Sequence, residues 1–358
     1  MINQFKVNYF KLVIMWTNSY SKSRSCFKEL TLKEYTTFDK TVGSYLIDND
    51  KETSIDYLYL HNKKSKNLHI IISGTHGVEG YPGSAIQFQT LQNLSGHETS
   101  YLIIHALNPY GFKNNRRCTK NNVDLNRNYL ESNNYKDVNY PEIIFDLIST
   151  FLYSLQFIYL FFCILYQYGY TKSREYIVKG QYSYKNGLFY GGQSREENIV
   201  VLEKILSTIE YNKFDDIYIF DIHSGLGRYG NLSVMVIQDK TLQKLHNIDF
   251  NSTTQLVNMS IDNIYKESKG SIIEGVYKYI INKDPDKNVY PIILEYGTYS
   301  NIRLFYHLLL ENYYFCNKNN AIEWGEESKN LKSMFYVEND DWKNLVINNY
   351  NDFIKLLK

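Results

Sequence analysis

Cysteine is scarce in this sequence of 358 residues. The four cysteines are widely scattered and none forms a C-x-x-C pair. This spacing argues against a structural zinc knuckle and against a disulfide framework, and it is typical of a reducing compartment. Net charge is also nearly absent, because 39 basic residues stand against 38 acidic ones. We therefore expect a cytoplasmic protein and have no reason to expect a nucleic-acid partner.

The sequence also lacks the features that divide or export a chain. It contains no repeat, no proline-rich linker and no G-x-S-x-G elbow of a serine hydrolase, and the apolar run at 12–16 is too short for a signal peptide. The composition, with 44% hydrophobic and 22% charged residues, is that of a chain that folds around a core. We predict one domain over residues 17–358 after an N-terminal extension at 1–16.

One long run, 147–166, carries no formal charge and approaches the length of a membrane span. A span here would place His76 and His223 on opposite sides of a bilayer, and Ser149, Ser154 and Gln156 interrupt the run. We therefore predict a helix over 142–168 that is largely buried against the sheet, with membrane association through 147–166 as the less favoured alternative.

Elsewhere strand patterns alternate with helix patterns. Strands are predicted at 55–60, 68–73, 101–106, 217–222, 233–237 and 291–296. Helices are predicted at 21–35, 84–93, 196–211, 254–266, 303–317 and 340–357. Several strands are nearly continuous apolar runs, as in strands covered on both faces. The pattern predicts an α/β domain with a mixed, mainly parallel central sheet flanked by helices.

Three short segments carry the residues that a catalytic zinc site needs. They are S-G-T-H-G-V-E-G (73–80), D-I-H-S-G-L-G (221–227) and I-L-E-Y-G-T (293–298). Two histidines and one carboxylate leave the fourth position of a tetrahedral zinc open, and a further glutamate can act as general base. All three segments follow strand candidates, at the edge of an open sheet where ligands bind.

Each of these residues also has an ordinary structural interpretation. His76 alone could be a hydrogen-bonded loop histidine, His223 a core histidine, and Glu295 the partner of a basic side chain. A fourth segment, 105–128, is rich in arginine and asparagine, and could be a solvated basic loop or a clamp for a carboxylate and an oxyanion.

Taken in order, H-G-x-E, N-P-x-G-F…R-R…V-D-L-N-R-N, D-I-H-S-G and E-Y-G-T resemble the carboxypeptidase-A-like zinc peptidase superfamily. That superfamily includes the succinylglutamate desuccinylase and aspartoacylase deacylases. Within it the chain is most similar to the uncharacterised branch called domain of unknown function 2817, through G-T-H-G-V-E-G-x-x-G-S-A-x-Q (74–87) and G-Q-Y…G-L-F-Y-G-G (180–192). The resemblance implies a zinc-carboxypeptidase-like (phosphorylase/hydrolase-like) fold.

The resemblance also implies a role for each matching residue. His76, Glu79 and His223 would bind one zinc ion, and Glu295 would be the general base. Asp124 would orient a ligand histidine. Asn126 and Arg127 would bind the substrate. Either Arg116 or Arg117 would polarise the scissile carbonyl, and the sequence does not choose between them.

We therefore expect a zinc metallohydrolase that cleaves an amide bond adjacent to a free carboxylate in a small peptide or N-acyl amino acid. The metallocarboxypeptidase form leads because of the Asn126–Arg127 pair, with the N-acyl-amino-acid deacylase form next. A non-catalytic binding protein on the same fold is the alternative from another class. The sequence gives no oligomeric state.

Overall fold

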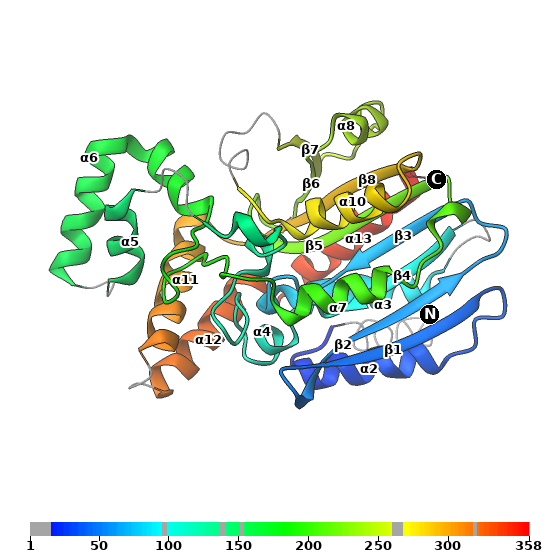
Figure 1. Ribbon diagram of the computed structural model, residues 1–358, viewed down its shortest axis with the longest axis horizontal. Coiled ribbons are helices and arrows are strands. Elements are labelled where there is room, and N and C mark those ends of the chain that lie inside the picture. The colour runs from blue at the N-terminus through cyan, green and yellow to red at the C-terminus, as the bar shows by residue number, and fades with distance from the viewer. Residues whose placement is uncertain are drawn as a thin grey trace.

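A central sheet of eight strands organises the protein (Figure 1). The computed structural model describes residues 16–94, 99–136, 141–150, 154–259, 268–317 and 321–357, so the predicted extension at 1–16 lies outside it except for residue 16. The strands are β1 (Asp39–Ile47), β2 (Asp50–His61), β3 (Asn67–Ile72), β4 (Thr99–His105), β5 (Asp216–Gly225), β6 (Leu232–Val236), β7 (Thr254–Asn258) and β8 (Asn288–Gly297).

The sheet is mixed, with a parallel centre. Its order is β1-β2-β4-β3-β5-β8-β6-β7. The four central strands β4, β3, β5 and β8 are parallel, whereas β1, β2 and β6 each pair antiparallel with a neighbour. The carboxyl ends of the parallel strands therefore meet at one edge of the sheet. This architecture confirms the predicted fold class.

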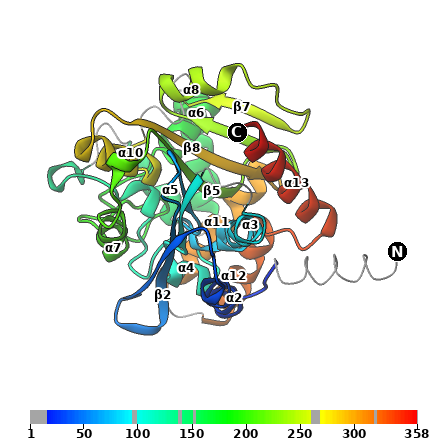
Figure 2. The same ribbon diagram turned by 90° about the vertical axis from the view of Figure 1, so that its right-hand side faces the viewer.

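Helices cover both faces of the sheet, as Figure 2 shows. The helices are α2 (Tyr20–Leu32), α3 (Gly80–Gln92), α4 (Pro109–Lys113), α5 (Glu142–Ser149), α6 (Leu155–Val178), α7 (Glu197–Leu206), α8 (Asp239–His246), α10 (Ile272–Lys283), α11 (Asn301–Cys316), α12 (Ala321–Phe335) and α13 (Asp340–Leu356). Helices α2, α3 and α13 pack on one face, and α7 and α10 pack on the other.

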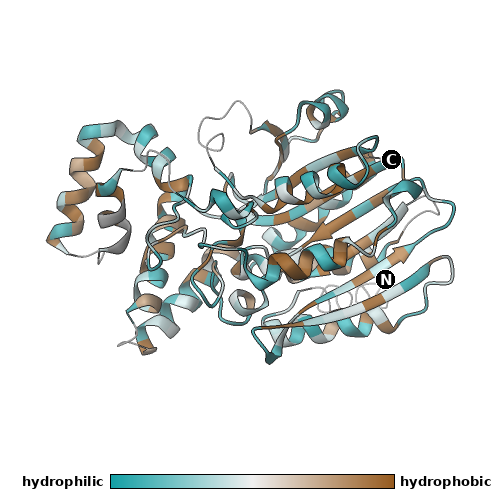
Figure 3. Ribbon diagram, viewed as in Figure 1, coloured by the Kyte–Doolittle hydropathy of each residue, from teal (hydrophilic) through white to brown (hydrophobic). Residues whose placement is uncertain are grey.

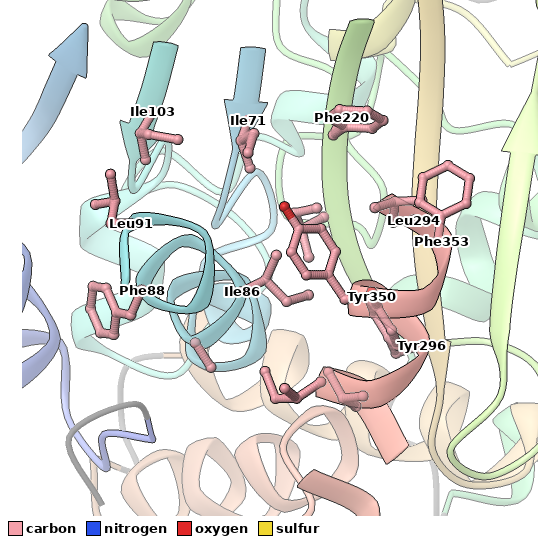
Figure 4. Packing of buried hydrophobic residues seen from close by; sticks show 14 of the residues in the cluster. Ile71, Ile86, Phe88, Leu91, Ile103, Phe220, Leu294, Tyr296, Tyr350 and Phe353 are labelled. Atoms are coloured by element: carbon pink, nitrogen blue, oxygen red, sulfur yellow. The ribbon is translucent and has the colours of Figure 1, made fainter. Parts of the chain in front are cut away.

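Alternation along the strands divides the core into two layers. Ile71 belongs to the layer under α3 and α13, while Ile70 and Ile72 belong to the opposite one. Figure 4 shows the first layer, where Ile71 and Phe220 of the sheet face Ile86 of α3 and Phe353 of α13. Because successive strand residues point to opposite faces, a continuous run of isoleucines fills both layers.

The predicted helix over 142–168 is wrong in two respects. The segment forms two helices, α5 and α6, with residues 151–153 outside the described part, and α6 contains a kink at Gly169, whose φ of +69° suits glycine. The pair projects away from the sheet instead of packing on it (Figure 1). Several of its apolar side chains are exposed, among them Leu155, Phe162 and Tyr166. Among the described residues, no helix is both long and apolar enough to span a bilayer.

The helix predicted at 254–266 is also wrong where the structure describes it. Residues 254–258 form β7, which pairs parallel with β6 and is the edge strand of the sheet, and 260–267 lie outside the described residues. Thr254 and Val257 are β-branched, and the open edge of β6 supplies hydrogen-bond partners that a local helix pattern does not reveal.

Candidate metal centre

The turn after β3 places the first two candidate ligands side by side. His76 precedes the 3₁₀ helix η1 (Gly77–Glu79), and Glu79 is its last residue. A 3₁₀ helix has three residues per turn, so positions 76 and 79 lie on the same side. The His76 Nδ1 atom lies 2.8 Å from Glu79 Oε1. Gly77 permits the turn to lie against α4, because a Cβ there would be 2.1 Å from the backbone of Gly111.

The neighbouring strands β5 and β8 bring the other two residues to the same place. His223 and Glu295 are direct register partners in this parallel pair. His223 Nδ1 lies 2.8 Å from Glu79 Oε2, and the Ser224 amide donates a hydrogen bond to the same oxygen. Glu295 Oε1 accepts a hydrogen bond of 2.8 Å from the Leu226 amide. The three segments that the sequence singled out therefore converge on one point.

A second set of carboxylates lies behind the two imidazoles. Asp124 Oδ1 is 3.3 Å from His76 Nε2, and Asp221 Oδ2 is 2.9 Å from His223 Nε2. With a carboxylate at Nε2, each ring turns its Nδ1 toward Glu79, which is the arrangement that fixes histidine ligands in metal sites. Asp124 was predicted for such a role from the family motif.

Asp221 was given no role by the sequence reasoning, although a signal was present. It stands two residues before His223 on β5, and a strand places such residues on the same face. Its other oxygen, Oδ1, accepts a hydrogen bond of 2.7 Å from Thr75 Oγ1.

The buried charges of the cluster stabilise one another. Burial alone would raise the pKa of Glu79, but His76 and His223 lower it well below its ordinary value. Burial likewise opposes ionisation of Asp124, whose pKa Arg117 and His76 lower. The pKa of His223 would fall on burial, but Asp221 and Glu79 raise it well above the usual range.

Glu295 is shifted in the opposite direction. Burial first, and then the nearby charge of Glu79, raise the pKa of Glu295 to about 8. A carboxyl group that titrates close to neutral pH can both accept and return a proton under working conditions, as a general base and acid must.

The donor set fits a zinc ion. In the described part of the chain, one atom from each of His76, Glu79 and His223 can be chosen so that all three lie within 4.8 Å of one another. Ligands of a tetrahedral zinc at about 2.1 Å lie about 3.4 Å apart, so small side-chain movements suffice. Both imidazoles already direct Nδ1 toward the Glu79 carboxylate. The Nε2 atom of each lies close to a second carboxylate, Asp124 for one ring and Asp221 for the other.

Arg116 and Arg117 point into different surroundings although they are adjacent in sequence. Arg116 is fully buried away from the centre, where it pairs with Glu311 and stacks on Phe315. Arg117 donates from Nε to Asp124 at 2.9 Å and has Nη1 3.9 Å from Glu79 Oε1. The structure therefore does not place Arg116 at the site, whereas Arg117 lies at the site and lines its cavity.

Asn126 and Arg127 lie on the wall of the same cavity as the His–Glu–His cluster. Asn126 Oδ1 accepts a hydrogen bond from the Ile272 amide. The Arg127 guanidinium donates to the carbonyls of Asn126 and Val178, at 2.7 and 2.6 Å. These contacts fix both side chains at the cavity, and a substrate carboxylate would have to share the guanidinium with the two carbonyls.

The cavity has a volume of about 570 Å³ and extends well beyond the residues that the sequence identified. Helix α6 supplies part of its wall, including Arg174, a third cationic side chain at the cavity. No local motif marks these residues. They reach the site only because the C-terminal part of α6 comes back to the cavity after the helix has projected away from the sheet.

Asp221 carries the first testable prediction. Replacing it with asparagine keeps its shape but removes the negative charge 2.9 Å from His223 Nε2, so we expect metal affinity to fall about 10–100-fold. Competition with a chelator of known affinity measures the change. Asp286→Asn, at an exposed loop residue, is the matched control. Equal affinity of the Asp221 variant and wild type would mean that Asp221 serves only to hold Thr75.

Comparison with known families identifies the chain. The family model "Protein of unknown function (DUF2817)" matches residues 16–349. The chain therefore belongs to this family, which confirms the branch suggested by its motifs. No curated protein sequence matches the chain.

Solved structures similar to this one include a putative carboxypeptidase and an aspartoacylase family protein. Bovine thrombin-activatable fibrinolysis inhibitor, in complex with tick carboxypeptidase inhibitor, is 11% identical, with 89% of this chain and 98% of that chain covered and a TM-score of 0.46. A putative carboxypeptidase from Burkholderia mallei is 12% identical, with coverage of 93% and 69% and a TM-score of 0.44. An aspartoacylase family protein from Mesorhizobium loti is 13% identical, with coverage of 82% and 69% and a TM-score of 0.36. The activity of this chain has to be inferred from its own residues.

Proposed function

We propose that this protein is a zinc-dependent hydrolase that cleaves an amide bond adjacent to a free carboxylate. The observation that carries the proposal is the convergence of His76, Glu79 and His223, with Glu295 as the strand neighbour of His223. A purely structural metal site would have four protein ligands, whereas this cluster offers three and opens onto a large cavity. A zinc ion held there would supply Lewis acidity toward a carbonyl oxygen and toward water.

Each remaining group has a role in the chemistry of hydrolysis. Glu295, with a pKa raised to about 8 by burial and by Glu79, would take a proton from water and pass it to the leaving nitrogen. Arg117 is held at the site by Asp124 and would donate a hydrogen bond to the carbonyl oxygen as negative charge develops there. Asn126 and Arg127 would bind the carboxylate of the substrate, with the guanidinium supplying charge-assisted hydrogen bonds.

The need for a free carboxylate gives a direct test. Peptides and N-acyl amino acids with a free carboxylate should be cleaved about tenfold to a hundredfold faster than their C-terminal amides, since one charge-assisted bond in a desolvated site is worth about 1.5–3 kcal/mol. Rates on matched acid and amide pairs, measured with protein of known zinc content, give the ratio.

Arg127→Lys should reduce this discrimination without emptying the zinc site, because an ammonium cannot reproduce the planar fork of a guanidinium. Arg303→Lys is the control, since Arg303 is exposed on α11 and does not line the cavity. Equal rates on acids and amides would refute the carboxylate requirement. Zinc-loaded protein that cleaves no member of either panel would refute the hydrolase and leave a binding protein on this fold.

A further inference from the structure

The cavity lining combines a polar set of residues with a larger apolar set. The polar set includes the His–Glu–His cluster with Glu295 and the arginines. The remaining wall is mostly apolar and comes from several elements: Leu165 and Ile177 of α6, Met235 of β6, Ile293 of β8, and Leu304 and Leu308 of α11. A substrate whose only large groups are polar would leave this wall against water, which costs free energy roughly in proportion to the apolar area.

Helix α6 contributes to this wall with one side and faces solvent with another. Phe157, Leu160 and Ile164 pack into a hydrophobic cluster with α11. Leu155, Phe162 and Tyr166 are 85%, 64% and 95% exposed. No charged residue occurs from 147 to 171. Figure 3 shows the resulting hydrophobic colouring along the projecting helix.

Phe161 joins the two apolar surfaces. It lines the cavity and is also 39% exposed, and its ring lies 6.0 Å from that of the exposed Phe162. The apolar surface is thus continuous from the outside of α6 into the cavity. Contiguous exposed apolar surface is a feature of interaction sites, and here it leads toward the candidate metal centre.

We propose that the substrates are amphiphilic amides, N-acyl amino acids with a long aliphatic acyl chain, and that the chain lies along the cavity wall formed by α6 and α11. This inference rests on the proposed function and names its substrate class. The acyl chain would extend past Leu165 toward Phe161, while the carboxylate remains at Asn126 and Arg127. In hydrolysis, the oxygen of water bonds to the acyl carbon, the C–N bond breaks and the nitrogen takes up a proton, so the products are a long-chain fatty acid and a free amino acid.

A series of N-acylglycines tests the proposal. From acetyl to hexanoyl, kcat/KM should rise about tenfold to a hundredfold, because each buried methylene contributes up to about fourfold, and it should rise further to dodecanoyl. Leu165→Glu places a carboxylate on the apolar wall and should abolish the rise with chain length. Gln167→Glu adds the same charge on the same helix at an exposed position outside the cavity, and it should behave as wild type.

A binding measurement separates this inference from the proposed hydrolysis. Metal-free protein should bind N-dodecanoylglycine in a calorimetric titration, and Leu165→Glu should weaken binding at least about tenfold. Leu165→Trp, which narrows the cavity without adding charge, should select against dodecanoyl over acetyl and covers the case in which the glutamate variant does not fold. Selective binding without turnover of any acylglycine by zinc-loaded protein would support the ligand class and refute hydrolysis.

A kcat/KM that does not depend on chain length would overturn the inference. A preference set by the amino acid would also overturn it. In that case kcat/KM would rise as much from N-acetylglycine to N-acetylphenylalanine as it does from N-acetylglycine to N-dodecanoylglycine. That result would assign the apolar wall to the side chain of a peptide's terminal residue.

Discussion

Replacing Glu295 with glutamine is expected to lower turnover about 10²–10⁴-fold while the protein keeps its zinc. Glutamine has nearly the same shape and can still accept the hydrogen bond from the Leu226 amide. It cannot accept a proton from water at neutral pH, so the loss should appear in kcat. Steady-state kinetics on the best acid substrate, together with metal analysis of the same preparation, provide both readouts.

Glu323→Gln is the matched control, because Glu323 lies exposed on α12 and has no part in the cavity. It should leave both turnover and metal content unchanged. Near-normal turnover in the Glu295 variant would show that the carboxylate is structural. Loss of zinc from that variant would instead assign Glu295 to metal binding.

Removing one imidazole is expected to empty the metal centre. His76→Ala leaves only Glu79 and His223 of the three converging donors, and it also leaves Asp124 without the ring 3.3 Å away. Two protein ligands do not retain zinc against a chelator, so metal content should fall from about one ion per chain to nearly none and activity should fall with it. Elemental analysis after dialysis against a weak chelator measures the change.

His246→Ala provides the comparison, since His246 is exposed at the end of α8 and does not line the cavity. Its metal content should equal that of wild type. If His76→Ala kept its zinc, the metal would have to be bound elsewhere and the interpretation of the His–Glu–His cluster would be wrong. Circular dichroism of both variants would show whether a loss of metal reflects a loss of fold.

The sequence predicted those parts of the site whose geometry is local. The H-x-x-E spacing of His76 and Glu79 works because a single 3₁₀ turn brings residues three apart together. The apolar runs that precede each motif predicted the central strands, since strands covered on both faces need few polar residues. The same period-two rule would have revealed Asp221 two residues before His223, had it been applied there.

Other features could not be read from local patterns. Residues 254–258 form an edge strand because they pair with the backbone hydrogen-bonding groups of β6. Those groups belong to residues outside the segment, so the pattern of the segment itself does not reveal them. The apolar run around α6 looked like a buried helix, yet much of it is exposed, because composition states how apolar a segment is and not what covers it.

By itself the sequence determined the class of fold, the family and the three segments that carry the candidate ligands. Only the tertiary structure decided that His223 and Glu295 are register neighbours, that Arg117 reaches the centre while Arg116 is buried against Glu311, and that α6 forms a wall of the cavity. The physical reason is the range of the interactions. Turns and strand alternation depend on residues a few positions apart, whereas strand register, the direction of a buried side chain and the return of a projecting helix are set by packing between distant parts of the chain.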